Sequence, residues 1–236
     1  MMTDSAPNTE LLRSLGRLVR GLSALFWGLP AALVVCVGTA SAGWFGEYGI
    51  APPVAATGLL FFGLWQLGSF QKQERPWRGA LDRARFFALV NLWLSPFLYW
   101  WNRVPAQPFF DLVLQVLALS SLLFLMSLNR VLERLGAMLP DEGLRQETRH
   151  FTRINCGLLL ATSLVAVAMF LPRWMPTPWQ FVTNRLLTPE HDQAWVFLVR
   201  FLLPLAVFLL LPLAMTMALV WKTKEAILDS IFGAER

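Results

Sequence analysis

Six long apolar runs dominate this sequence, at residues 22–44, 53–70, 86–101, 109–128, 154–174 and 194–221. The hydrocarbon core of a membrane takes about 20 apolar residues in helical form and leaves no backbone group unpaired, so each run is expected to be a helix. Charged residues make up 15% of the chain, whereas an ordinary soluble domain has about 25%. The sequence therefore predicts an all-α, polytopic transmembrane helical bundle with about six spans.

Basic residues are divided unevenly between the segments that connect these runs. Sixteen of the 20 Lys and Arg residues fall in the N-terminal segment, the second and fourth connections and the C-terminal tail, and four fall on the other side. Basic residues near span ends are retained in the cytoplasm. Both termini are therefore predicted to be cytoplasmic, in the inner membrane of a bacterial-type cell. The run at 86–101 is short, but leaving it out would put the basic connections on conflicting sides.

The first run allows one alternative topology. Its end, Thr39-Ala40-Ser41-Ala42, resembles the cleavage site of a signal peptide. Cleavage after Ala42 would leave five spans and an N-terminus outside the cytoplasm. The long polar region before the run favours an uncleaved span, and N-terminal sequencing of the mature protein would distinguish the two.

Residues 1–21 are predicted to be a polar N-terminus and a basic flank, ahead of a single transmembrane domain at 22–236. Residues 1–10 are expected to be unstructured. Leu11, Leu15 and Leu18 then fall on one face of an amphipathic helix at the membrane surface. The arginines of this flank either orient the first span or hold anionic lipid headgroups.

Residues 129–153 are predicted to form a cytoplasmic helical hairpin. Its centre, Pro140-Asp141-Glu142-Gly143, is typical of a turn between two helices. Helical spacing places apolar residues on one side of each arm, namely Val131, Leu132, Leu135, Leu144 and Phe151. This apolar seam either binds a protein partner or packs the two arms together.

Two ionisable residues lie inside the predicted spans. Asp111 and Arg200 fall at similar outer depth and are candidates for an ion pair between the fourth and sixth spans. The alternative is that Asp111 caps its helix and the Arg200 side chain extends to the membrane surface. Prolines are expected to kink three of the spans, at Pro30, Pro96, Pro204 and Pro212.

No residue pattern in the sequence is typical of catalysis, metal binding or cofactor binding. His150 and His191 fall on opposite sides of the predicted membrane, and Cys36 and Cys156 lie in or beside apolar runs. The net charge of +5 is spread over several short connections, so a nucleic-acid partner is not expected. Neutral polar residues in the runs, such as Asn91 and Ser95, are expected to form hydrogen bonds between helices.

These patterns favour a non-enzymatic interaction, scaffold or sensory subunit of a membrane complex, with membrane lipids around it and a protein partner at the hairpin. The alternative is a small permease or channel that uses the kinked helices at 86–101 and 194–221. In that case Arg200 would attract an anion. A lipid-processing enzyme at the membrane surface is a third and weaker hypothesis, because only ordinary loop carboxylates and His150 are available to it.

Overall fold

The computed structural model describes residues 5–41, 46–68, 75–104, 107–138, 142–170 and 203–232. These residues are helical and contain no strand, so the predicted all-α class is confirmed. The helices are α1 (Ser5–Ser41), the short 3-10 helix η1 (Gly46–Tyr48), α2 (Ala51–Leu67), α3 (Arg75–Leu94), α4 (Phe97–Arg103), α5 (Pro108–Met138), α6 (Glu142–Phe170) and α9 (Leu203–Phe232).

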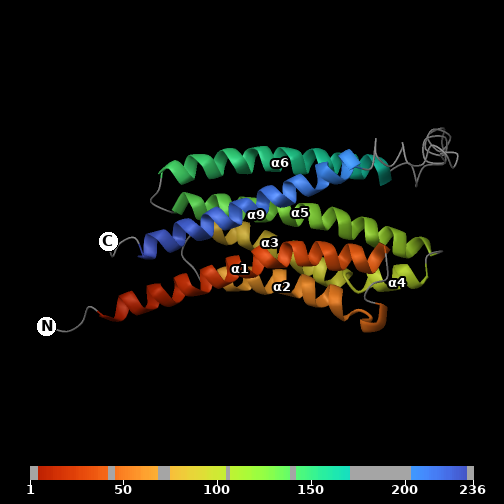
Figure 1. Ribbon diagram of the computed structural model, residues 1–236, viewed down its shortest axis with the longest axis horizontal. Helices are drawn as coiled ribbons and strands as arrows, with labels where there is room; N and C mark the ends of the chain where they lie inside the picture. The colour runs from red at the N-terminus through yellow and green to blue at the C-terminus, as the bar shows by residue number, and fades with distance from the viewer. Residues whose placement is uncertain are drawn as a thin grey trace.

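The long helices lie side by side along one direction (Figure 1). The first turn of α1 and the last turn of α9 lie at the same end of the bundle. Along the chain, α1 packs against α2, α2 against α3, α3 against α5 and α5 against α6, while α9 contacts α1, α5 and α6. The core between them is built mainly from leucines, including Leu18, Leu22, Leu25, Leu64, Leu128 and Leu132.

Three segments of the described helices are long and apolar enough to cross a membrane: Arg13–Ala40, Pro108–Met138 and Arg145–Val167. The 17 residues of α2 are also apolar, but they span about 25 Å, which is less than the ~30 Å hydrocarbon core. The run predicted at 86–101 is divided by the turn at Ser95 and Pro96, and the run at 194–221 begins outside the described residues. The described part of the chain is therefore all-helical, and its three long apolar segments are typical of a membrane protein.

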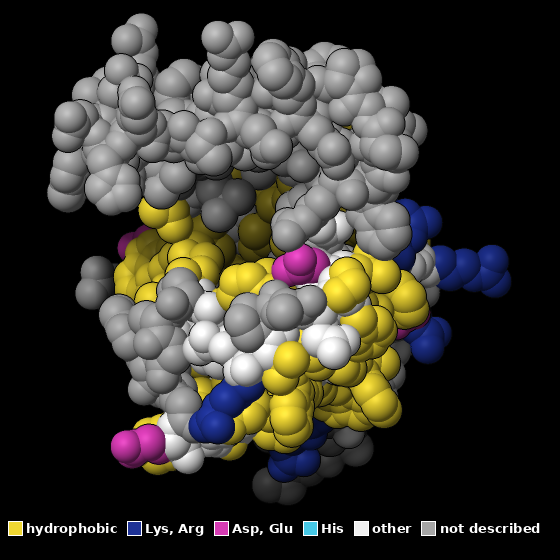
Figure 2. Space-filling view, turned by 90° about the vertical axis from the view of Figure 1, so that its right-hand side faces the viewer, with side chains coloured by type: hydrophobic (Ala, Val, Ile, Leu, Met, Phe, Trp, Pro, Cys, Tyr) yellow, Lys and Arg dark blue, Asp and Glu magenta, His cyan; other side chains and the backbone are white. Residues whose placement is uncertain are grey.

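Large hydrophobic side chains point outward along the helices. Viewed along the bundle from the end opposite the first turn of α1, they cover much of the flanks of the described helices (Figure 2). We call this surface the apolar belt; its most exposed members include Trp27, Val34, Phe62, Trp65, Phe86, Trp93, Ile154, Leu160, Leu164 and Trp221. A soluble monomer rarely exposes so large a contiguous apolar surface, whereas lipid tails would cover it.

The N-terminal flank differs from its prediction. A single helix, α1, begins at Ser5 and continues through Pro30 to Ser41, so residues 5–10 are helical and the flank is continuous with the first apolar run. Leu18 is buried in the core, while Arg13, Arg17 and Arg20 are exposed. The apolar face of the flank therefore packs against the bundle itself, because neighbouring helices extend far enough to cover it.

The two N-terminal helices approach each other closely at two glycines. A Cβ at Gly63 would lie 2.9 Å from the Leu25 side chain and 3.1 Å from the carbonyl oxygen of Gly21. A Cβ at Gly21 would lie 2.8 Å from the carbonyl oxygen of Gly63. Small residues permit this backbone approach, as they do in many membrane helix pairs.

Candidate functional site

Basic side chains gather at the end of the bundle where α1 begins and α9 ends. We call it the basic end. The N-terminal parts of α1, α3 and α6 and the C-terminal parts of α5 and α9 all lie there (Figure 1). Its exposed basic residues include Arg13, Arg17, Arg20, Arg75, Arg78, Arg83, Arg130, Arg134, Arg145, Arg149, Arg153 and Lys222. These residues come from segments that are far apart in the sequence, and the fold brings them to one end of the bundle.

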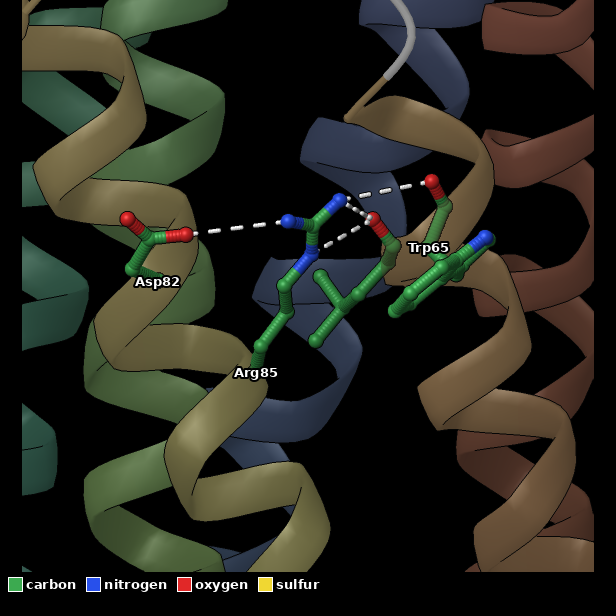
Figure 3. Close-up of polar contacts among 4 residues, drawn as sticks. Trp65, Asp82 and Arg85 are labelled. Atoms are coloured by element: carbon green, nitrogen blue, oxygen red, sulfur yellow. Dashed lines mark hydrogen bonds and ion pairs between the residues drawn. The ribbon is translucent and has the colours of Figure 1, made fainter.

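Arg85 of α3 caps the C-terminal end of α2. Its guanidinium donates hydrogen bonds to the carbonyl oxygen of Leu64, at 3.3 and 3.4 Å, and to that of Trp65, at 3.4 Å. It lies 5.5 Å from the centre of the Trp65 ring and 3.6 Å from a carboxylate oxygen of Asp82 (Figure 3). The last carbonyl groups of a helix lack partners and carry partial negative charge, so a cation there stabilises the helix end.

The environment of Arg85 is only partly aqueous, since 26% of its side chain is exposed. Burial lowers the pKa of its guanidinium, and the negative charge of Asp82 partly offsets that effect. From the sequence, Arg85 is only one of the basic residues of the second connection. Its role as a cap depends on how α2 and α3 pack, and no local pattern marks it.

The apolar seam of the predicted hairpin faces inward. Val131, Leu132 and Leu135 are at most 1% exposed and belong to the core, and Phe151 packs partly buried against it. Leu144 lies in α6, but its side chain is outside the described residues. The described seam residues therefore pack inside the bundle.

The outer face of the same hairpin is charged. Arg145, Arg149 and Arg153 follow one another at intervals of four residues, so they form one stripe on α6, and all are exposed. Ile154, the first exposed member of the apolar belt on this helix, comes directly after the stripe. Residues 142–153 would therefore extend about 18 Å beyond the first exposed belt residue of their own helix.

Three helices are joined by a buried polar cluster at the base of this hairpin. The Asn155 amide nitrogen donates to Asn129 Oδ1 (3.1 Å), to Thr216 Oγ1 (2.9 Å) and to the Pro212 carbonyl oxygen (3.2 Å). The Asn129 amide donates to Thr216 Oγ1 at 3.0 Å. Asn155 Oδ1 is buried and has no hydrogen-bond partner among the described residues. The cluster fixes the relative heights of α5, α6 and α9.

A second set of polar contacts joins α2, α3 and α5 deeper in the bundle. Thr57 donates to Ser95 Oγ at 3.3 Å, and Ser120 donates to Asn91 Oδ1. A cavity of about 160 Å³ lies beside these contacts, lined mainly by apolar side chains of α1, α2, α5 and α9. Asn91 and Ser95 therefore form hydrogen bonds with residues of other helices, as expected from the sequence.

Asp111 lies near the start of α5, where it accepts a hydrogen bond of 2.8 Å from the indole Nε1 of Trp101. Arg200 lies outside the described residues, so the proposed Asp111–Arg200 pair stays a prediction. Of the four candidate kink sites, Pro30 and Pro212 lie inside α1 and α9, and Pro96 lies between α3 and α4. Pro204 lies in the first turn of α9, where a proline costs no hydrogen bond.

No three His, Cys, Asp or Glu side chains among the described residues come close enough together to hold a metal ion. The chain matches no known family model, no curated protein and no solved structure. The charged outer face of the hairpin and the basic end around it are therefore the features on which a function can be argued.

Proposed function

We propose that this chain is a six-span protein of the inner membrane with both termini in the cytoplasm, and that it acts as a non-enzymatic interaction or scaffold subunit. The observation that carries this proposal is the stripe of Arg145, Arg149 and Arg153 on a hairpin that extends beyond the apolar belt. A stripe of one charge on a helix held rigidly by its partner helix is suited to an acidic protein surface.

The contact surface in this proposal is the charged stripe of Arg145, Arg149 and Arg153, not the apolar seam of the hairpin. Deleting residues 129–153 would remove core side chains such as Leu132 and Leu135 and would unfold the bundle. A test must therefore change only exposed side chains.

The partner test compares two pairs of substitutions with equal loss of charge. The protein is cross-linked in native membranes and its complexes are separated by size. Arg149→Gln with Arg153→Gln is expected to abolish a complex that the unmodified chain forms. Arg13→Gln with Arg17→Gln, at the same end but on α1, is the control and should retain it. A chain that migrates as a monomer in native membranes would contradict the proposal.

Topology is tested separately with single cysteines in a chain whose Cys36 and Cys156 are replaced by serine. Ala137 and Gln107 are exposed at opposite ends of the bundle. A membrane-impermeant maleimide applied to intact cells should label Gln107→Cys and not Ala137→Cys. The reverse pattern would place the basic end outside the cytoplasm and would contradict the positive-inside argument.

A further inference from the structure

A pocket of about 480 Å³ lies between α3 and α5 at the basic end. It is separate from the charged stripe on α6 that is proposed to bind a partner. Its size is within the range of small-molecule sites, about 300 to 1,000 Å³. The residues that line it are Pro76, Gly79, Ala80 and Arg83 of α3 and Ser127, Arg130, Glu133 and Arg134 of α5.

The pocket has a surplus of positive charge. Three arginines and one glutamate line it, which leaves a net charge of +2. The carboxylates of Asp82 and Glu147, which do not line the pocket, form ion pairs with Arg85 and Lys222. Guanidinium groups match the oxygens of a phosphate in pairs, so converging arginines are suited to a phosphate group.

The shape of the pocket also leaves room for a ligand. Arg130 and Arg134 are four residues apart and therefore share one face of α5, opposite Arg83 of α3. Apart from Arg83, the α3 wall is made of Pro76, Gly79 and Ala80, and a Cβ at Gly79 would meet no heavy atom within 4 Å. Ser127 adds a hydroxyl group at a buried position, 9% exposed.

The height of the pocket coincides with the edge of the apolar belt. On α3, Phe86 (60% exposed) follows Arg83 by three residues. On the α5 side, the Asn155–Asn129 hydrogen bond places Arg130 at the level of Ile154, where the belt begins on α6. Trp65, exposed beside Arg85, marks the same level, since tryptophan favours the headgroup layer.

We infer that this pocket binds the phosphate of an anionic phospholipid headgroup. The inference rests on the proposed membrane placement and not on the proposed protein partner. Basic pockets between helices on the cytoplasmic side are suited to such headgroups, while the acyl chains lie along the adjacent belt. Arg83, Arg130 and Arg134 bind the phosphate oxygens, and Glu133 disfavours a second anion.

The test uses the full chain purified in an uncharged detergent. Native mass spectrometry measures binding of short-chain phosphatidylglycerol, short-chain phosphatidylcholine and inorganic phosphate. Phosphatidylglycerol is expected to bind most tightly. Arg130→Gln and Arg134→Gln should each weaken its binding about fivefold, and Arg17→Gln, an exposed arginine outside the pocket, should leave it unchanged.

A second pair of variants tests the site without changing charge. Gly79→Leu places a side chain in the pocket and should abolish tight binding of phosphatidylglycerol. Gly157→Leu is the control, because Gly157 on α6 also has no heavy atom near an added Cβ. Equal binding by the Gly79→Leu protein would overturn the inference.

Two other outcomes would also overturn it. Inorganic phosphate binding as tightly as phosphatidylglycerol would assign the pocket to a soluble phosphate compound. No preference for phosphatidylglycerol, together with an acidic protein that copurifies and is lost from the Arg130→Gln variant, would assign it to a protein. Failure of the hairpin cross-linking test leaves this inference intact, because lipid binding is measured on the purified chain.

Discussion

The side-chain amide of Asn155 in α6 donates a hydrogen bond of 3.1 Å to the side-chain carbonyl of Asn129 in α5. Both residues are buried, and Thr216 of α9 accepts from each of them. Together, Asn155, Asn129 and Thr216 join three helices at the base of the hairpin. This cluster therefore sets the height of the charged stripe relative to α5 and α9.

Replacing Asn155 with alanine is expected to destabilise the bundle. The substitution removes three hydrogen bonds and leaves buried acceptors on Asn129 and Pro212 without this donor, which should cost about 1 to 2 kcal/mol. Thermal unfolding in detergent measures the loss. Ser163→Ala is the control, because among the described residues the Ser163 hydroxyl donates within its own helix, to the Leu159 carbonyl oxygen. Equal stability of the two variants would show that the cluster adds little.

Leu135→Ala should lower the free energy of unfolding by about 2 to 4 kcal/mol, because it leaves a cavity in a well-packed core. Leu135 is 1% exposed. Arg134→Ala, at the adjacent exposed position, should change stability by less than about 0.5 kcal/mol. The same unfolding measurement applies. A Leu135→Ala protein of unchanged stability would mean that the seam is available to a partner.

Arg85→Met should destabilise the α2–α3 contact by about 1 to 2 kcal/mol, since the last carbonyl groups of α2 would lose their cation. Gly68→Ala should act similarly, because its added Cβ would clash with Nη2 of Arg85. Unfolding temperature is the readout. Arg78→Met, an exposed arginine on the same helix, serves as the control, and a decrease as large as that of Arg85→Met would argue against the capping role.

Gly63→Val is expected to separate α1 from α2. The larger side chain would collide with Leu25 and with the backbone at Gly21, at a cost of about 1 to 3 kcal/mol. A cysteine pair placed across the two helices should then cross-link more slowly. Gly58→Val provides the comparison, because a Cβ at Gly58 meets its nearest heavy atom only at 3.9 Å.

Much of the helical structure could be predicted because helix formation depends on local sequence. Apolar runs of about 20 residues indicate where helices lie, and α5 ends at Met138, just before the turn predicted around Pro140. Gly143, predicted to be part of that turn, lies in α6. The exact extent of α1 was harder to predict. Leu18 and Leu22 pack in the core with other helices, and this packing stabilises the polar N-terminal turns of α1. Such packing cannot be predicted from local sequence.

The contacts that form the candidate site depend on the order of the helices in the bundle. Asn155 and Thr216 are separated by 61 residues and Arg85 and Leu64 by 21. Spacing alone identifies Val131, Leu132 and Leu135 as one apolar face, but it does not say whether α6, α9 or another protein covers that face. Likewise, the sequence shows Arg83 and Arg130 as separate flanking charges, and only packing of α3 against α5 brings them to one pocket.

The capping of α2 by Arg85 has a consequence for biogenesis. α2 has 17 residues, and the cation that donates to its Leu64 and Trp65 carbonyl groups belongs to the next helix, while the Gly68 backbone N–H also donates to Trp65. In the proposed membrane placement, α2 alone would present the Leu64 carbonyl to lipid without a cation during synthesis. With that placement, α2 and α3 should leave the insertion machinery as a pair, with α2 retained until α3 has emerged from the ribosome.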